Sequence, residues 1–155
     1  MSKKEAALSY FDKGFSCSQS VFAAYAGDLG LDRETALRIA GGFGGGMGRK
    51  AETCGAVSGA LMAIGLKYGS INADDKESKE KAYALVREFI DRFEAQHGSI
   101  VCKELLDWDI STPAGHEVAK YRRLFSTLCP KYVESAAEIV EKILAEQDRN
   151  EDQSF

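Results

Sequence analysis

The chain lacks the features of membrane and exported proteins. It has no run of roughly 18 or more uncharged apolar residues, the length that a membrane-spanning helix requires. Its first residues include Lys3, Lys4 and Glu5 and lead into an amphipathic segment, not into the apolar stretch of a signal peptide. We therefore expect a soluble, cytoplasmic protein that does not insert into a membrane.

An excess of positive charge is also missing. Twenty Lys and Arg residues stand against 24 Asp and Glu residues, which gives a net charge of −4. Proteins that bind nucleic acid need a concentrated Lys/Arg surface to contact the phosphates. We expect no nucleic-acid partner.

Several catalytic motifs are absent. A phosphate-binding loop is excluded because Lys50 is followed by Ala51, not by Ser or Thr. No Ser/His/Asp order or pair of carboxylates stands out. The chain contains no Cys-x-x-Cys, which excludes adjacent thiols of the thioredoxin type, and no Cys-x-x-Cys-His, which excludes covalent c-type haem.

Four widely spaced cysteines are the main chemical feature that is present: Cys17, Cys54, Cys102 and Cys129. Three of them stand where a helix is expected to begin. The start of a helix presents unpaired N–H groups and a partial positive charge, which favour the thiolate over the thiol. This effect is worth about 0.3–1 kcal/mol, under one pKa unit, so strong activation needs further contacts.

Helical periodicity covers most of the chain, and no strand alternation or hairpin signal interrupts it. The pattern predicts an all-α, single-domain bundle of about seven or eight helices, with residues 1–147 as the four-cysteine domain and 148–155 as a polar, frayed tail. A Gly-rich loop, 41–48, precedes the central helix. The expected helices are Lys3 to Lys13, Cys17 to about Gly27, Arg33 to about Ala40, about Glu52 to Leu66, Lys76 to about Gln96, a short helix after Ser99 through Leu106, about Glu117 to Phe125, and Pro130 to Gln147.

Residues 41–59 are unusually rich in small side chains, since eight of the nineteen are glycine. After Cys54, small residues recur at 55, 56, 59, 60 and 63, which places a shallow groove on one helix face. Another helix can pack closely there. Cys54 is then either a reactive thiol or a small residue of the core.

The chain resembles a bacterial and archaeal family labelled C_GCAxxG_C_C, whose proposed redox activity is inferred largely from its cysteines. The resemblance covers about residues 10–135. It rests on the Gly-Phe-Ser-Cys segment at Cys17, the Gly-Phe-Gly-Gly-Gly run, the Cys-Gly-Ala-Val-Ser-Gly segment at Cys54, Cys102, and Cys129-Pro130. It implies redox chemistry at the four cysteines but no substrate class.

Three functional interpretations remain open. In the first, clustered thiols transfer electrons by thiol/disulfide exchange with an unknown redox partner, with Cys54 as nucleophile and Cys17 as resolving thiol. In the second, Cys17, Cys54, Cys102 and Cys129 bind zinc or an iron–sulfur cluster, although the nearest two are 27 residues apart. In the third, the protein is a non-enzymatic assembly module, for example a homodimer, with structural cysteines. His116 is expected at the surface.

Overall fold

The protein folds into helices, which confirms the all-α prediction. A computed structural model describes residues 1–153, and these form seven α-helices of at least seven residues, several shorter helical turns and no strand. The helical elements, in chain order, are α1 (Lys3–Asp12), α2 (Cys17–Ala26), the 3-10 turn η1 (Gly27–Leu29), α3 (Arg33–Ala40), α4 (Gly44–Met47), α5 (Gly55–Tyr68), α6 (Lys76–His97), α7 (Cys102–Leu106), α8 (Pro113–Tyr121), α9 (Leu124–Thr127) and α10 (Cys129–Asp152).

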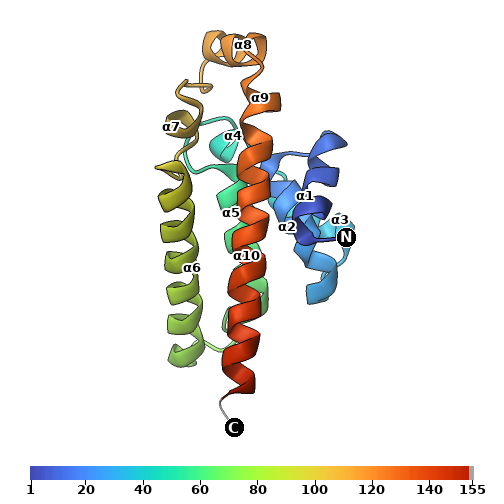
Figure 1. The fold of residues 1–155 in the computed structure, drawn as a ribbon, viewed down its shortest axis with the longest axis vertical. Coiled ribbons are helices and arrows are strands. Elements are labelled where there is room, and N and C mark those ends of the chain that lie inside the picture. The colour runs from blue at the N-terminus through green and yellow to red at the C-terminus, as the bar shows by residue number, and fades with distance from the viewer. Residues whose placement is uncertain (154–155) are drawn as a thin grey trace.

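Helices α5, α6 and α10 form the body of the bundle (Figure 1). Helices α1, α2 and α3 lie along one flank, where α2 packs against α5, and α1 packs against α2 and α10. The short elements α7, α8 and α9 gather at one end of the bundle. This arrangement brings together segments that are far apart in the sequence.

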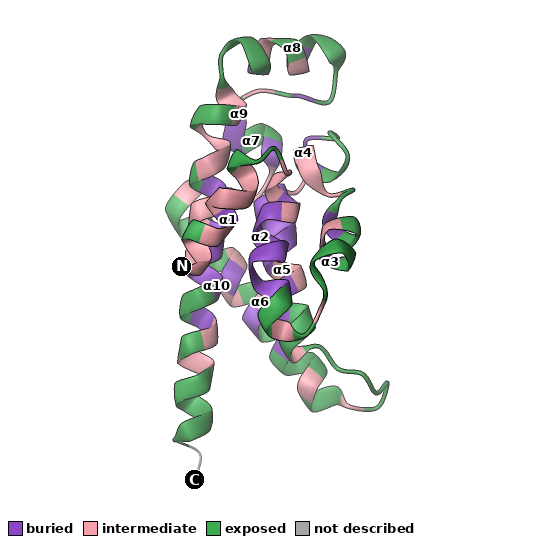
Figure 2. Ribbon diagram, turned by 90° about the vertical axis from the view of Figure 1, so that its right-hand side faces the viewer, coloured by how far each residue is buried: buried purple, intermediate pink, exposed green. Residues whose placement is uncertain are grey.

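The core is centred on α2 and α5, which are the most continuously buried helices (Figure 2). Small side chains fill much of α5, where Ala56, Ala60 and Ala63 are fully buried. The longest helices, α6 and α10, are amphipathic: Phe89 and Phe93 of α6 are fully buried, for example, while charged residues cover the outer face. Among the described residues, no helix is long and apolar enough to cross a membrane.

The central helix begins later than the sequence pattern predicts, at Gly55 instead of Glu52. The preceding residues are extended, and Thr53 forms an isolated antiparallel bridge with Val101. This pairing joins residues about 50 positions apart, so no local pattern reveals it. Ser99 likewise does not cap the following helix, because Val101 occupies that position.

The helix predicted from Glu117 to Phe125 is instead two elements. Helix α8 begins at Pro113, and the Gly115 N–H donates to the Thr112 hydroxyl (3.0 Å) as an N-terminal cap. The chain then turns at Arg123, whose φ is +59°, before the short α9. This left-handed residue ends the helical run, since α-helix requires negative φ.

The last helix extends beyond the predicted end at Gln147, because α10 continues to Asp152. Two ion pairs stabilise this extension: Asp148 contacts Lys67 (3.4 Å) and Glu151 contacts Lys81 (3.3 Å). The frayed tail predicted for 148–155 is therefore wrong over most of its length. Residues 154 and 155 lie outside the described part of the chain.

Candidate functional site

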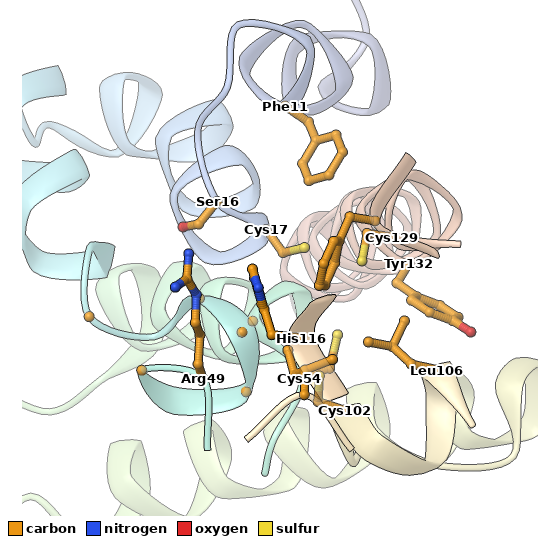
Figure 3. A pocket seen from close by; sticks show the side chains of 18 of the residues that line it. Phe11, Ser16, Cys17, Arg49, Cys54, Cys102, Leu106, His116, Cys129 and Tyr132 are labelled. Carbon is orange, nitrogen blue, oxygen red and sulfur yellow. The ribbon is translucent and has the colours of Figure 1, made fainter. Parts of the chain in front are cut away.

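All four cysteines line one cavity of about 590 Å³ at the end of the bundle where α2, α5, α7 and α10 begin (Figure 3). Cys17, Cys102 and Cys129 are the first residues of their helices, and Cys54 immediately precedes α5. The two central cysteines are buried, whereas Cys17 and Cys129 are half-buried. All four are free thiols.

A capping box positions Cys17 at the start of α2. The Ser16 hydroxyl accepts a hydrogen bond from the Gln19 N–H (3.4 Å), and the Gln19 side chain accepts one from the Ser16 N–H (3.1 Å). Ser18, fully buried, donates its hydroxyl hydrogen to the Ala40 carbonyl (2.8 Å). These bonds determine where α2 begins and hold it against the end of α3.

The isolated bridge places Cys54 and Cys102 beside each other. The Cys54 N–H donates to the Ile100 carbonyl (2.7 Å), and the Cys102 N–H donates to the Glu52 carbonyl (2.5 Å). Residues on either side of a bridged pair point to the same face of the two chains. Cys54 and Cys102 are thus held on one side, toward the cavity.

Close packing of α2 on α5 brings Cys17 near Cys54. A Cβ at Gly59 would lie 2.6 Å from the Ser18 carbonyl oxygen, and one at Gly55 would lie 3.3 Å from Cys17 Cβ. Any larger side chain would push the two helices apart. The small-residue groove predicted after Cys54 is therefore occupied by α2.

A left-handed turn of the Gly-rich segment forms another wall of the cavity. Residues 45–49 all have positive φ, and these include Met47 (+69°) and Arg49 (+67°). A Cβ at Gly46 would lie 2.7 Å from Cys102 Cβ and 2.6 Å from the Glu52 nitrogen. Successive left-handed residues are rare outside glycine, and each non-glycine residue in this conformation costs free energy. Here the conformation brings the backbone of Gly46 directly against Cys102.

The thiols of Cys17 and Cys129 interact directly. Each is the side-chain hydrogen-bond partner of the other, and both line the cavity from the starts of α2 and α10 (Figure 3). This bond lowers the pKa of Cys129 against the opposing effect of burial. The same bond, together with burial, raises the pKa of Cys17 well above that of an ordinary thiol. The pair therefore ionises first at Cys129, with Cys17 retaining the shared proton.

Burial dominates the other two cysteines. It raises the pKa of Cys54 to about 11, although the N–H groups of Ala56 and Val57 act in the opposite direction. No regular capping hydrogen bond forms at this helix start. Burial also raises the pKa of Cys102 to about 12, and the nearby Cys54 adds to the increase. Both are neutral thiols at neutral pH.

Other cavity residues were not singled out by the sequence pattern. His116, expected at the surface, is half-buried in the cavity wall, with its ring 5.3 Å from that of Phe125. Phe11 and Tyr132 add aromatic rings, and the Tyr132 hydroxyl donates to the Leu105 carbonyl (2.7 Å). No local signal marks these residues, because only the tertiary fold brings their helices to one place.

The geometry gives no support to the metal interpretation. Within residues 1–153, no group of three or more His, Cys, Asp or Glu side chains is arranged to hold a metal ion. The contact between Cys17 and Cys129 is instead a thiol–thiol hydrogen bond. The four cysteines share one cavity, but not as a ligand set.

Comparison with known proteins identifies the family. The family model described as "Putative redox-active protein (C_GCAxxG_C_C)" matches residues 15–143, a segment that contains all four cysteines. No curated protein and no solved structure matches the chain. The matched segment is most of the protein, and the chain therefore belongs to the C_GCAxxG_C_C family.

Proposed function

We propose that the protein catalyses thiol/disulfide exchange, with Cys129 as the attacking thiolate and Cys17 as the resolving thiol. The observation that carries the proposal is that both residues line one cavity at the starts of their helices, where a side-chain hydrogen bond couples the two thiols. Such a contact both activates one thiol and keeps its partner within reach. The nucleophile proposed here differs from the one predicted from sequence, Cys54, because burial keeps Cys54 protonated.

The reaction has two steps that transfer two electrons in all. The Cys129 thiolate attacks one sulfur of an acceptor disulfide, the acceptor S–S bond breaks, and its other sulfur leaves as a thiolate. That thiolate takes up a proton released by Cys17. The Cys17 sulfur then attacks Cys129, expels the second acceptor thiol, which is protonated from solvent, and closes a Cys17–Cys129 disulfide. The acceptor is reduced to two thiols and the protein is oxidised.

Cys54 and Cys102 are assigned a supporting role in this mechanism. With pKa values of about 11 and 12 they stay neutral at pH 7, so they do not repel the Cys129 thiolate. They line the cavity next to the reacting pair. Direct attack by either one is disfavoured because only the thiolate is nucleophilic.

A thiol count in glutathione redox buffers tests the proposal. The reduced wild-type chain is expected to lose two thiols reversibly, and Cys17→Ser and Cys129→Ser to lose this transition. Cys102→Ser is the matched control and should retain it. Four thiols that stay reduced under mildly oxidising conditions would contradict the proposal, and so would stoichiometric zinc or iron that disappears in Cys54→Ser.

A further inference from the structure

The cavity itself restricts which acceptors can reach the proposed thiol pair. Its volume of about 590 Å³ is within the range of small-molecule sites, about 300–1,000 Å³. The sulfur atoms lie in its wall, and Cys54 and Cys102 beside them are only 6% and 8% exposed. A space of this size holds a small disulfide with its S–S bond beside the half-buried Cys17 and Cys129. The dimensions of the cavity therefore favour a small acceptor over a disulfide on a folded protein.

The surface around the sulfur atoms is apolar and aromatic. Phe11 and Phe125 contribute rings, and Leu106 and Ile110 contribute aliphatic side chains. The polar end of Tyr132 is satisfied by the Leu105 carbonyl, so the ring is the part available to a ligand. Rings gain from offset or edge-to-face contact with other rings. This lining favours an acceptor with a flat, apolar body.

One cation stands among these groups. Arg49 lines the cavity, and Figure 3 shows its side chain beside Ser16, on the same side of the cavity as His116. Nothing in residues 1–153 forms an ion pair or hydrogen bond with its guanidinium. The left-handed backbone at Arg49 holds this side chain against Gly45. An unpaired guanidinium suits a carboxylate or a similar anion.

We propose that the acceptor is a low-molecular-weight disulfide that carries an aromatic or similarly flat apolar group and an anionic group. The apolar group lies against Phe11, His116 and Phe125, and the anion pairs with Arg49. The S–S bond then lies over Cys129 and Cys17. This inference rests on the proposed function, and it adds the substrate class and two specificity-determining contacts.

Four commercial disulfides test separately whether the acceptor needs an aromatic group and whether it needs an anionic group. Dithiobis(nitrobenzoate) is aromatic and anionic, dithiodipyridine is aromatic and neutral, oxidised glutathione is anionic without a ring, and cystamine is cationic without a ring. The second-order rate constant of each with the reduced protein is divided by its rate constant with N-acetylcysteine at the same pH. The normalised value removes the intrinsic reactivity of each disulfide.

We expect the normalised rate constant to be highest for dithiobis(nitrobenzoate) and lowest for cystamine. Arg49→Gln should lower the value for the anionic aromatic disulfide about two- to five-fold, as befits one exposed ion pair, and leave that for dithiodipyridine unchanged. Lys50→Gln is the matched control, because Lys50 is the exposed neighbouring cation and does not line the cavity.

A second pair of variants tests the aromatic contact. Phe125→Leu should reduce the normalised rate constant for both aromatic disulfides but not for oxidised glutathione, whereas Tyr121→Leu, at a side chain that is 88% exposed, should reduce neither. Equal normalised values for the four disulfides, equal effects of Arg49→Gln and Lys50→Gln, or faster reaction with a disulfide-bonded protein would overturn the substrate assignment. If none of the disulfides produces a Cys17–Cys129 bond, the proposed function fails as well.

Discussion

At the scale of single residues, burial and a neighbouring thiol outweigh the electrostatics of the helix ends. The start of α5 contributes under about one pKa unit at a surface site, yet the pKa of Cys54 is raised to about 11 because the thiol is buried. Cys129 is half-buried, and its pKa is lowered because Cys17 donates a hydrogen bond to it. The hydrogen bond from a neighbouring thiol, more than the position at a helix start, therefore determines which cysteine ionises most easily.

This difference predicts the order of thiol ionisation. Alkylation of Cys129 by iodoacetamide should reach half its maximal rate at a lower pH than alkylation of an ordinary thiol, and Cys17→Ala should shift that midpoint upward. The other groups that face Cys129 across the cavity are Cys54, Cys102, His116, Arg49 and Tyr132. Peptide mapping after pulsed alkylation measures each cysteine separately. Faster labelling of Cys54 than of Cys129 at pH 7 would contradict the assignment.

The buried thiol of Cys54 predicts a loss of stability at alkaline pH. Its folded pKa, about 11, lies above the unfolded value near 9, so its contribution is complete below pH 9 and is lost as pH rises toward 11. In this window the unfolded state releases the proton first, and the free energy of unfolding falls by up to about 1.4 kcal/mol per pH unit.

Urea unfolding of wild type and Cys54→Ser at pH 8.5 to 10.5, under reducing conditions, measures this contribution. The serine variant, which does not titrate there, should lose stability less steeply. The exposed-site variant Tyr121→Phe serves as the control and should follow the wild-type slope. Parallel slopes for wild type and Cys54→Ser would show that Cys54 is not buried as a neutral thiol.

Local sequence patterns predict where some of the cysteines lie on their helices, but not how buried or how reactive each one is. The position of Cys17 at a helix start follows from Ser16, which is visible in the sequence, and the small-residue run indicates only that Cys54 lies near the beginning of the central helix. The burial of Cys54 depends on the packing of α2 and of residues 100–102 beside it, and the interaction of Cys17 with Cys129 joins residues more than 100 positions apart. The roles of the individual thiols could therefore not be predicted locally.

At the scale of elements, the crossing of α2 over α5 positions the site. The two helices approach so closely that Gly59 has no room for a side chain, since a Cβ would lie 2.6 Å from the Ser18 carbonyl oxygen. Cys17 and Cys54 lie at the ends of these same helices. Their separation is thus determined by the packing of small residues.

Gly59→Ala should destabilise the fold by about 1–3 kcal/mol, because overpacking forces the backbones apart. Gly65→Ala in the same helix is the matched control: a Cβ there meets nothing within 4 Å, so the better helix propensity of alanine should stabilise the protein by up to about 1 kcal/mol. Urea unfolding curves of both variants give the comparison. Equal effects in the same direction would contradict the close crossing.

The limits of helix prediction are clear at this scale. Asp32 and Asp75 cap α3 and α6 through side-chain contacts within three residues, and these starts follow from the sequence. The start of α5 does not, because residues 52–54 pair with residues 100–102. Helix starts that depend on local hydrogen bonds are predictable, whereas one displaced by a long-range bridge is not.

At the scale of the whole molecule, the bundle joins the beginning and the end of the chain at the site. Cys17 lies in the first helical pair and Cys129 at the start of the last helix. A disulfide between them would close a loop of about 110 residues, which in the chain-entropy model stabilises the folded state by about 4–5 kcal/mol. Oxidation is therefore coupled to global stability.

The oxidised protein should melt about 10 °C higher than the reduced protein, given about 2–4 °C for each kcal/mol in a chain of this size. Differential scanning calorimetry with and without dithiothreitol measures the difference. Cys129→Ser should melt at one temperature under both conditions. An unchanged or lower melting temperature on oxidation of the wild type would mean that no unstrained bond forms across this loop.

The bundle architecture was predictable because amphipathic periodicity is strong in α6 and α10, where Phe89, Phe93, Val133 and Ile143 follow helical spacing. The cavity was not, because it is formed by residues from eight helical elements and from the loops between them. The predicted homodimer stays a prediction that a sizing measurement can test.

Disulfide mapping shows directly whether Cys17 and Cys129 form the redox-active pair. The reduced chain is oxidised with one equivalent of a mild oxidant, blocked with an alkylating reagent, digested and analysed by mass spectrometry. We expect one dominant cross-link, between the peptides of Cys17 and Cys129, with Cys54 and Cys102 alkylated. A dominant link from Cys17 to Cys54, or no intramolecular link at all, would contradict it.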